Sequence, residues 1–130
     1  MKGRFGLQQR FRSAGVENCF ISEITLAELK FGVENSPTHA RTQAMLDNFL
    51  TGVKVLPIFH ALDLYAKEKA RLRKTGTPVD DFDLLIGVTA VTHGLIMVTN
   101  NKRHFERINN IQLEDWIGDN DANATSPRIS

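Results

Sequence analysis

The sequence predicts an α/β fold in which helices cover both faces of a parallel sheet. Short continuous apolar runs, at residues 18–21, 53–56 and 95–99, are typical of strands buried on both faces. Longer segments between these runs carry apolar residues at helical spacing. Strands that alternate with helices in this way are joined by crossover connections, so we expect them to lie parallel in one sheet.

The composition is that of one globular domain. At 130 residues the chain is long enough to bury a core without disulfides. Its formal net charge is +1, so binding to a polyanion has to use a local patch. The single cysteine, Cys19, lies in an apolar run and predicts a buried thiol in a reducing compartment. No apolar run approaches the roughly 20 residues that cross a bilayer, and the basic start lacks the apolar core of a signal peptide. We therefore expect a cytoplasmic protein without a membrane partner.

The first half of the chain is expected to hold three helices and two strands. Arg4 to Ala14 has the spacing of a short amphipathic helix. Ser22 is a good N-cap directly after the strand at 18–21, and the dense apolar residues that follow it indicate a largely buried helix. Pro37 starts another helix, which Gly52 ends. The expected order is helix, strand, helix, helix, strand.

The second half predicts further helices and strands, followed by a polar tail. Residues 61–74 end in basic side chains, which suit a helix C-terminus, and residues 80–93 form a helix that Gly94 ends. The remaining expected elements are a strand at 95–99, a helical turn at 102–107 and a strand at 111–113. Residues 118–130 have almost no apolar content and are expected to be a disordered tail, which leaves residues 1–117 as the folded domain.

Three carboxylates, Asp80, Asp81 and Asp83, stand directly before the apolar segment LLIGVTAV. Charge next to so apolar a segment is costly unless something positive binds it. Asp80 and Asp83 share a helix face, and hard divalent cations prefer oxygen ligands of this kind. Spacing alone favours the alternative, a helix N-cap followed by an acidic residue. Both roles can coexist, with Asp80 as cap and Asp83 in a metal pocket, while Asp81 points elsewhere.

Glu28 lies inside an apolar helix, flanked by Ala27 and Leu29. A glutamate on the buried side of such a helix needs a partner, which makes it a candidate metal ligand. Two alternatives remain equally open: a capping box formed by Thr25 and Glu28, or a side chain that points to solvent.

A polar pair, Asn100 and Asn101, follows the apolar strand at 95–99. Loop asparagines usually serve turns, yet an amide at the carboxyl end of a strand can also hold a metal-bound water or a phosphate. The adjoining basic run, Lys102, Arg103 and His104 with Arg107, is either a solvated helix face or a contact for a phosphate backbone.

Two stretches together carry a family resemblance: ISEITLAELKFGVENS, and GTPVDDFDLLIGVTAVTHGLIMVTNNKRHFERINNIQLEDW. From about residue 18 to residue 116 the chain closely resembles the PIN-domain ribonuclease toxins of the VapC type. The resemblance implies a three-layer PIN fold and an endoribonuclease that uses Mg²⁺ or Mn²⁺ to cut RNA, commonly tRNA. It also implies inhibition by a small antitoxin protein, and a homodimer.

The resemblance assigns roles to particular residues. Glu28 matches the metal-site glutamate of the family, and Asp83 in DFDLLI matches its central aspartate. Asn101 falls where many relatives have an aspartate, and Asp80 matches an acidic position that some relatives share. The implied catalytic residues are Glu28, Asp83 and Asn101; the implied metal ligands are Glu28, Asp83 and Asp80; the implied RNA contacts are Lys102 and Arg103.

The chain departs from the family pattern at its start. Family members begin with a strand that ends in Asp-Thr-Asn and lies in the middle of the sheet, and this sequence shows no such strand. We therefore expect a sheet without its first, central strand and a metal site without one of its carboxylates. The alternative function is a catalytically impaired PIN remnant that binds an antitoxin or a dimer partner without cutting RNA.

Overall fold

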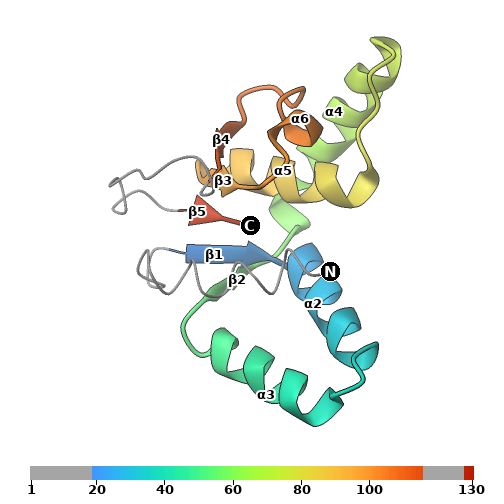
Figure 1. Cartoon of the computed structure of the whole chain (residues 1–130). Coiled ribbons are helices and arrows are strands. Elements are labelled where there is room, and N and C mark those ends of the chain that lie inside the picture. Colours follow the sequence, from blue (N-terminus) through green and yellow to red (C-terminus); the bar gives the residue numbers. More distant parts are fainter. Residues whose placement is uncertain (1–18, 116–127) are drawn as a thin grey trace.

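A parallel sheet of five strands forms the centre of the fold (Figure 1). The structure, a computed structural model, describes residues 19–115 and 128–130. The sheet order is β2-β1-β5-β3-β4, and every neighbouring pair is parallel. The strands are β1 (Cys19–Ser22), β2 (Lys54–Leu56), β3 (Ile96–Val98), β4 (Gln112–Glu114) and β5 (Arg128–Ile129). The predicted parallel α/β sheet is confirmed, whereas the predicted helix at residues 4–14 lies outside the described residues.

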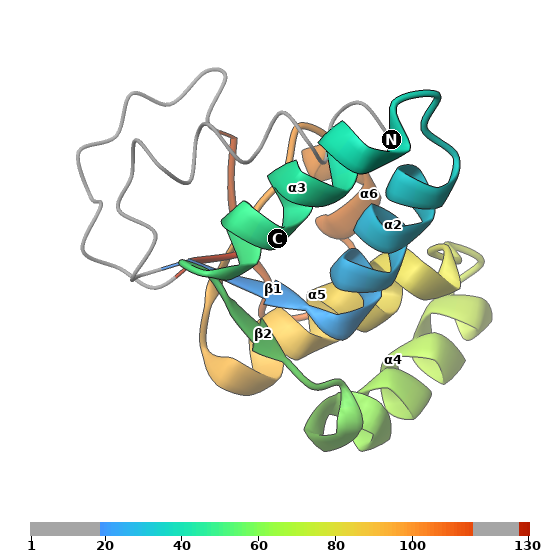
Figure 2. The same cartoon turned by 90° about the horizontal axis from the view of Figure 1, so that it is seen from below.

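The helices gather in two groups beside this sheet. They are α2 (Glu23–Glu34), α3 (His39–Leu50), the short 3₁₀ helix η2 (Phe59–Ala61), α4 (Leu62–Lys74), α5 (Asp81–His93) and α6 (Lys102–Phe105). The helices α2 and α3 lie side by side next to β1 and β2, while α4, α5 and α6 lie on the side of β3 and β4 (Figures 1 and 2). No helix within residues 19–115 is long and apolar enough to cross a membrane.

Local sequence signals set three helix ends where they were predicted, whereas the helix predicted from Pro37 to Gly52 spans His39–Leu50. The Ser22 hydroxyl accepts a hydrogen bond from the Thr25 amide at 3.1 Å and begins α2. Asp80 occupies the N-cap position of α5. Gly94 ends α5 with a φ of 66°, a left-handed conformation that glycine adopts without the steric cost of a Cβ atom.

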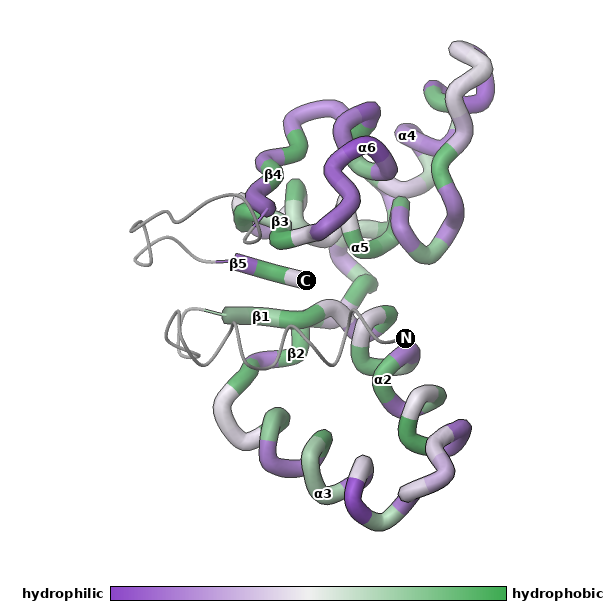
Figure 3. The backbone as a smooth tube through the Cα atoms, in the orientation of Figure 1, coloured by the Kyte–Doolittle hydropathy of each residue, from purple (hydrophilic) through white to green (hydrophobic). Residues whose placement is uncertain are grey.

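The interior contains two apolar clusters, and Phe20, Ile24 and Leu56 beside the first group of helices also pack against the second, larger cluster. We call β1, β2, α2 and α3 the first half of the fold; its cluster includes Ile21, Leu29, Val33 and Leu46. We call β3, β4, α4, α5 and α6 the second half; its larger cluster includes Leu72, Leu84, Ile86, Met97 and Ile108. Apolar colouring is continuous along β1 and much of α5, whereas α6 is hydrophilic (Figure 3).

Strand β5 occupies the middle of the sheet, between β1 and β3. One prediction is therefore wrong: that all of residues 118–130 are disordered. The predicted absence of the family's first strand concerns residues before 19, which lie outside the described residues, but the gap it was expected to leave in the middle of the sheet is filled by β5. Residues 118–127 lie outside the described residues, but Arg128 and Ile129 are buried and pair with both neighbours. The physical reason is that the inner edges of β1 and β3 carry backbone groups that need hydrogen-bond partners, and β5 supplies them.

Candidate functional site

The topology gathers most of the predicted site residues at one edge of the sheet. Strand β1 leads directly into α2, which carries Glu28, and Asn101 follows the carboxyl end of β3. Helix α5 ends where β3 begins, so its N-terminus, with Asp80 and Asp83, lies toward the carboxyl edge. Helices α2 and α5 are in contact. The carboxyl edge of an open parallel sheet is where such folds place their ligands.

Asp80 and Asp83 have different local partners at the start of α5. The Asp80 Oδ2 atom accepts hydrogen bonds from the amides of Phe82 at 3.1 Å and Asp83 at 3.5 Å, so the predicted cap is confirmed. Asp80 is exposed. The Asp83 side chain is 23% exposed, and its Oδ2 atom lies 3.4 Å from Nδ1 of His104 on α6. Asp83 is thus a half-buried carboxylate beside a ring that can donate a hydrogen bond.

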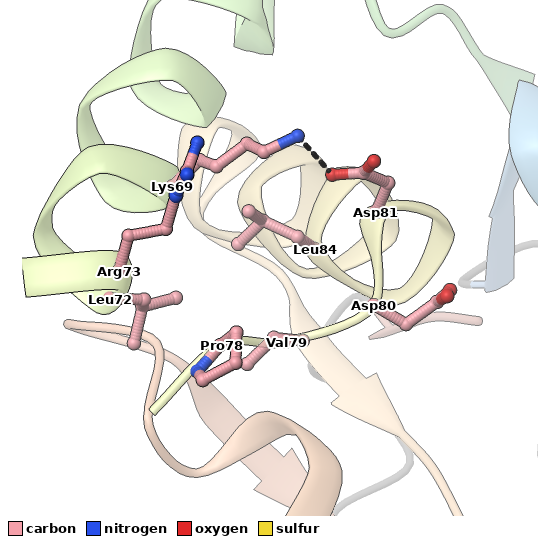
Figure 4. A pocket seen from close by; sticks show the side chains of 8 residues that line it. All are labelled: Lys69, Leu72, Arg73, Pro78, Val79, Asp80, Asp81 and Leu84. Atoms are coloured by element: carbon pink, nitrogen blue, oxygen red, sulfur yellow. Dashed lines mark ion pairs between the residues drawn. The ribbon is translucent and has the colours of Figure 1, made fainter. Parts of the chain in front are cut away.

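Asp81 points toward α4, as Figure 4 shows. The Lys69 Nζ atom lies 2.9 Å from the Asp81 Oδ1 atom, and the Tyr65 hydroxyl donates to the same oxygen at 2.8 Å. The hydrogen bond from Lys69, followed by that from Tyr65, lowers the pKa of Asp81, and the bond to Asp81 raises the pKa of Lys69. Asp81 therefore joins α5 to α4, which agrees with its predicted exclusion from the pocket.

Glu28 is half-buried on α2, and its Oε1 atom is fully buried. The buried oxygen rules out the alternative in which this side chain simply points to solvent. The capping-box alternative is also wrong, because Ser22 is the N-cap of α2. Thr25 instead donates its hydroxyl to the Ser130 backbone oxygen at 2.8 Å. Glu28 is left as a carboxylate held inside the fold by the packing of α2.

Asn101 occupies the N-cap position of α6 and is exposed. Its backbone amide donates to the Thr99 hydroxyl at 3.1 Å, and its backbone carbonyl oxygen accepts from the His104 amide at 3.1 Å. Lys102 and Arg103, in the first two positions of α6, are also exposed. The turn role of Asn101 is therefore present in the structure, and its exposed side chain is accessible to a ligand.

A hollow of about 350 Å³ brings together part of the predicted set. Its lining residues are Pro78, Val79, Asp80, Asp83, Arg103, His104 and Arg107. Asp80, Asp83 and Arg103 thus share one cavity, whereas Glu28, Asn101 and Lys102 are not among its lining residues. His104 and Arg107 belong to the basic run for which a phosphate contact was one of two predicted roles, although only Lys102 and Arg103 were selected as RNA contacts. Their spacing from Lys102 was the available signal.

A second hollow, of about 360 Å³, lies on the α4 side of the same loop (Figure 4). It shares Pro78, Val79 and Asp80 with the first hollow and adds Lys69 and Arg73. The loop before α5 therefore contributes to the lining of both hollows, and each hollow also has basic side chains in its lining.

The donor set decides which metal the site could hold. Among residues 19–115 and 128–130, no group of three or more His, Cys, Asp or Glu side chains forms a metal cage. The described part of the chain therefore builds no structural zinc site, which needs four nitrogen or sulfur ligands. Mg²⁺ differs, because it often takes one or two carboxylates and keeps several waters. The oxygens of Asp83 and Glu28 fit that chemistry.

Comparisons with known proteins show the family and the fold of this chain. The PIN domain family matches residues 5–111. The tRNA(fMet)-specific endonuclease VapC of Salmonella typhimurium is 38% identical over 111 residues, which cover 85% of this chain and 83% of that protein. Ribonuclease VapC2 of Haemophilus influenzae is 36% identical and covers 83% of this chain and 82% of that protein. The crystal structure of DNA-bound VapBC from Salmonella typhimurium superimposes with a TM-score of 0.77 at 38% identity, over 85% of this chain and 83% of that one.

Proposed function

This chain belongs to the PIN domain family, as a member of its VapC toxin type, and we propose that it is a metal-dependent endoribonuclease that cuts tRNA. One observation carries the proposal: Asp83, which the resemblance matches to the family's central aspartate, is half-buried at the start of α5 and shares a hollow with Arg103 and Arg107. The choice of tRNA is supported by the Salmonella relative, which is named for that substrate.

In this proposal Asp83 and Glu28 hold Mg²⁺ or Mn²⁺ through carboxylate oxygens. The bound cation would supply an activated water and would neutralise charge on the phosphate. Asp80 caps α5, which fixes the first turn that carries Asp83, and its exposed carboxylate can reach the metal through water. Asn101 offers its amide to the scissile phosphate or to the attacking water.

The charges around the hollow make RNA binding depend on the metal. The lining carries two carboxylates, Asp80 and Asp83, and two guanidinium groups, Arg103 and Arg107, so their formal charges cancel. A divalent cation would leave the hollow positive, and Arg103 with the neighbouring Lys102 would then contact successive phosphates. We infer that RNA enters from the α6 side.

The partners follow from the toxin type. A VapC-type toxin is expected to be inhibited by a small antitoxin protein and to form a homodimer. The Salmonella relative is described as a DNA-bound VapBC assembly, which supports an assembly of this chain with such a partner.

Cleavage of tRNA by the purified chain, with Mg²⁺ and with EDTA, tests the proposed activity. We expect cleavage with Mg²⁺ and none with EDTA. Asp83→Asn should lower the rate by about 100-fold or more, because a metal-bound carboxylate contributes several kcal/mol to the transition state. Asp81→Asn is the matched control, since Asp81 faces α4, and it should stay within a few-fold of the parent. Cleavage in EDTA, or an unchanged rate in Asp83→Asn, would refute the proposal.

A second candidate function is a non-catalytic PIN remnant that binds an antitoxin or a dimer partner. The observation that favours it is that the described residues build no three-ligand metal group. This function would be supported if the chain bound antitoxin yet cut no RNA at any Mg²⁺ concentration. Failure to bind antitoxin would exclude it.

A further inference from the structure

The candidate site is divided between the two halves of the fold. Glu28 belongs to the first half, on α2, whereas Asp83 and Asn101 belong to the second half. A single metal-dependent site needs these groups held at fixed separation, because small misplacements of catalytic groups cost large factors in rate. Helices α2 and α5 contact each other directly, and the sheet supplies a second connection that can align the two halves.

In the described sheet, β5 is the strand that pairs with both halves (Figure 1). On one side Arg128 and Ile129 pair with Cys19 and Phe20 of β1. On the other side the same two residues pair with Ile96 and Met97 of β3. The described strands β1 and β3 do not pair with each other, so β5 is their link within the sheet.

Two side chains anchor β5 to the second half. Ile129 is fully buried and belongs to the apolar cluster of that half. Arg128 is also buried, and its guanidinium donates to the carboxylate of Glu114 on β4, from Nε at 3.1 Å and from Nη2 at 3.1 Å. A buried two-pronged arginine–carboxylate pair is geometrically specific, so it fixes the register of β5.

Ser130 anchors the same segment to the first half. Its amide donates to the Phe20 carbonyl at 3.0 Å. Its backbone oxygen accepts two hydrogen bonds, from the Ser22 amide at 3.3 Å and from the Thr25 hydroxyl at 2.8 Å. Ser22 and Thr25 lie at the N-cap and in the first turn of α2, so Ser130 holds the start of the helix that carries Glu28.

We propose that residues 128–130 are a positioning element that clasps the two halves and so sets Glu28 opposite Asp83. The role of these carboxylates rests on the proposed function, whereas the clasp itself does not. The strand is two residues long and has one large apolar side chain, Ile129. Its release should therefore occur locally, at a lower free energy than unfolding of either half.

Amide hydrogen exchange on the full chain tests the clasp. The Ser22 amide reports β5, because its acceptor is Ser130, whereas the Thr99 amide reports the far side of β3, because its acceptor is Glu114. In Ile129→Asp we expect exchange at Ser22 to rise by about 100-fold while exchange at Thr99 changes little, since burying a carboxylate expels the strand locally. Ile129→Val is the matched control and should leave both amides protected. An equal rise at both amides, or no rise at either, would overturn the clasp.

A distance between the halves tests the positioning role itself. Spin labels are placed at Phe31→Cys on α2 and Phe82→Cys on α5, two exposed positions near Glu28 and Asp83, while the native Cys19 is buried. We expect one narrow distance distribution in this labelled chain and with Ile129→Val, and a distribution broadened several-fold with Ile129→Asp.

Thr25 provides a milder disruption that leaves the core intact. Thr25→Val removes the hydroxyl donor to Ser130, and we expect it to broaden the same distance distribution, whereas Thr25→Ser keeps the donor and should restore it. An unchanged distribution in both Ile129→Asp and Thr25→Val would overturn the proposal. Neither readout requires RNA cleavage, so an inactive parent would refute the proposed function without deciding the clasp.

Discussion

The two halves of the fold hold their candidate site residues by different means. In the second half the acidic residues have directional polar partners: Asp80 accepts from helix amides, Asp81 binds Lys69, and Asp83 lies beside His104. In the first half, the position of Glu28 depends on α2, which packs through Leu29 and Val33 and whose N-cap residue, Ser22, is bonded to Ser130. The acidic residues of the second half are thus held by contacts within that half. The first half depends on how α2 is held.

The difference between the two halves predicts which substitutions have only local effects on the structure. A substitution that breaks a polar contact of the second half should alter that contact and the stability it provides. A substitution that moves α2 or β5 should alter the relation between the halves.

Glu68→Ala should have the largest effect on stability. The Glu68 carboxylate is buried and accepts from Arg71 at 2.9 and 2.8 Å and from the Asn109 amide at 3.1 Å, so it joins α4 to the loop after α6. Its loss should lower the free energy of unfolding by about 2–3 kcal/mol. Urea denaturation measures this change, with the exposed Glu106→Ala as control. A loss below that of the control would contradict the prediction.

The same carboxylate predicts how stability depends on pH. The hydrogen bond from Arg71, aided by the Asn109 amide, lowers the pKa of Glu68 below its ordinary value of 4.5. A group whose pKa is lowered by folding stabilises the protein above its unfolded pKa and loses this contribution as pH falls through the folded pKa. Stability of the parent should therefore fall more steeply below about pH 4.5 than that of Glu68→Gln. Parallel curves of unfolding free energy against pH for the parent and Glu68→Gln would contradict this.

Gly87→Ala should have an intermediate effect. An added Cβ at Gly87 would meet the Cδ1 atom of Ile108, so the cluster of the second half would be overpacked. We expect a loss of about 1–2 kcal/mol. Ile108→Val removes that methyl group, so the double variant should recover part of the loss. Equal losses in the single and double variants would show that the contact is not the cause.

Asp80→Ala should have the smallest effect on stability, about 1 kcal/mol, because it removes the N-cap of α5. Asp80→Ser keeps a capping oxygen and should restore stability. The pair also separates the two roles of Asp80 in cleavage assays. Recovery of the rate in Asp80→Ser indicates a cap alone, whereas a rate that stays low assigns the carboxylate a part in metal binding.

Local signals predicted much of this fold. Ser22, Asp80 and Gly94 end or begin helices through contacts within four residues, so the printed sequence contains the whole signal. Strand β5 was not predictable in this way. Its one apolar residue is Ile129, and Arg128 resembles an exposed residue until Glu114, fourteen positions away, is placed beside it.

The sequence also predicted only part of the candidate site. Asp83 was identified from the apolar helix that follows it and from the family motif. Periodicity could not decide between the roles of Glu28, because Thr25, its apparent capping partner, binds a residue 105 positions away. The hollow that joins Asp83 to Arg107 also depends on how α6 packs beside α5, which no local pattern encodes.

A double-mutant cycle tests most directly whether the two halves contribute to one site. The measurement is kcat/KM for tRNA cleavage at saturating Mg²⁺, for the parent, Glu28→Gln, Asp83→Asn and the double variant. If both carboxylates serve one metal-dependent site, the double variant should be little worse than the more damaged single variant, because groups that act as a unit are not additive. Losses that multiply would contradict the account, since they would show that Glu28 and Asp83 act independently.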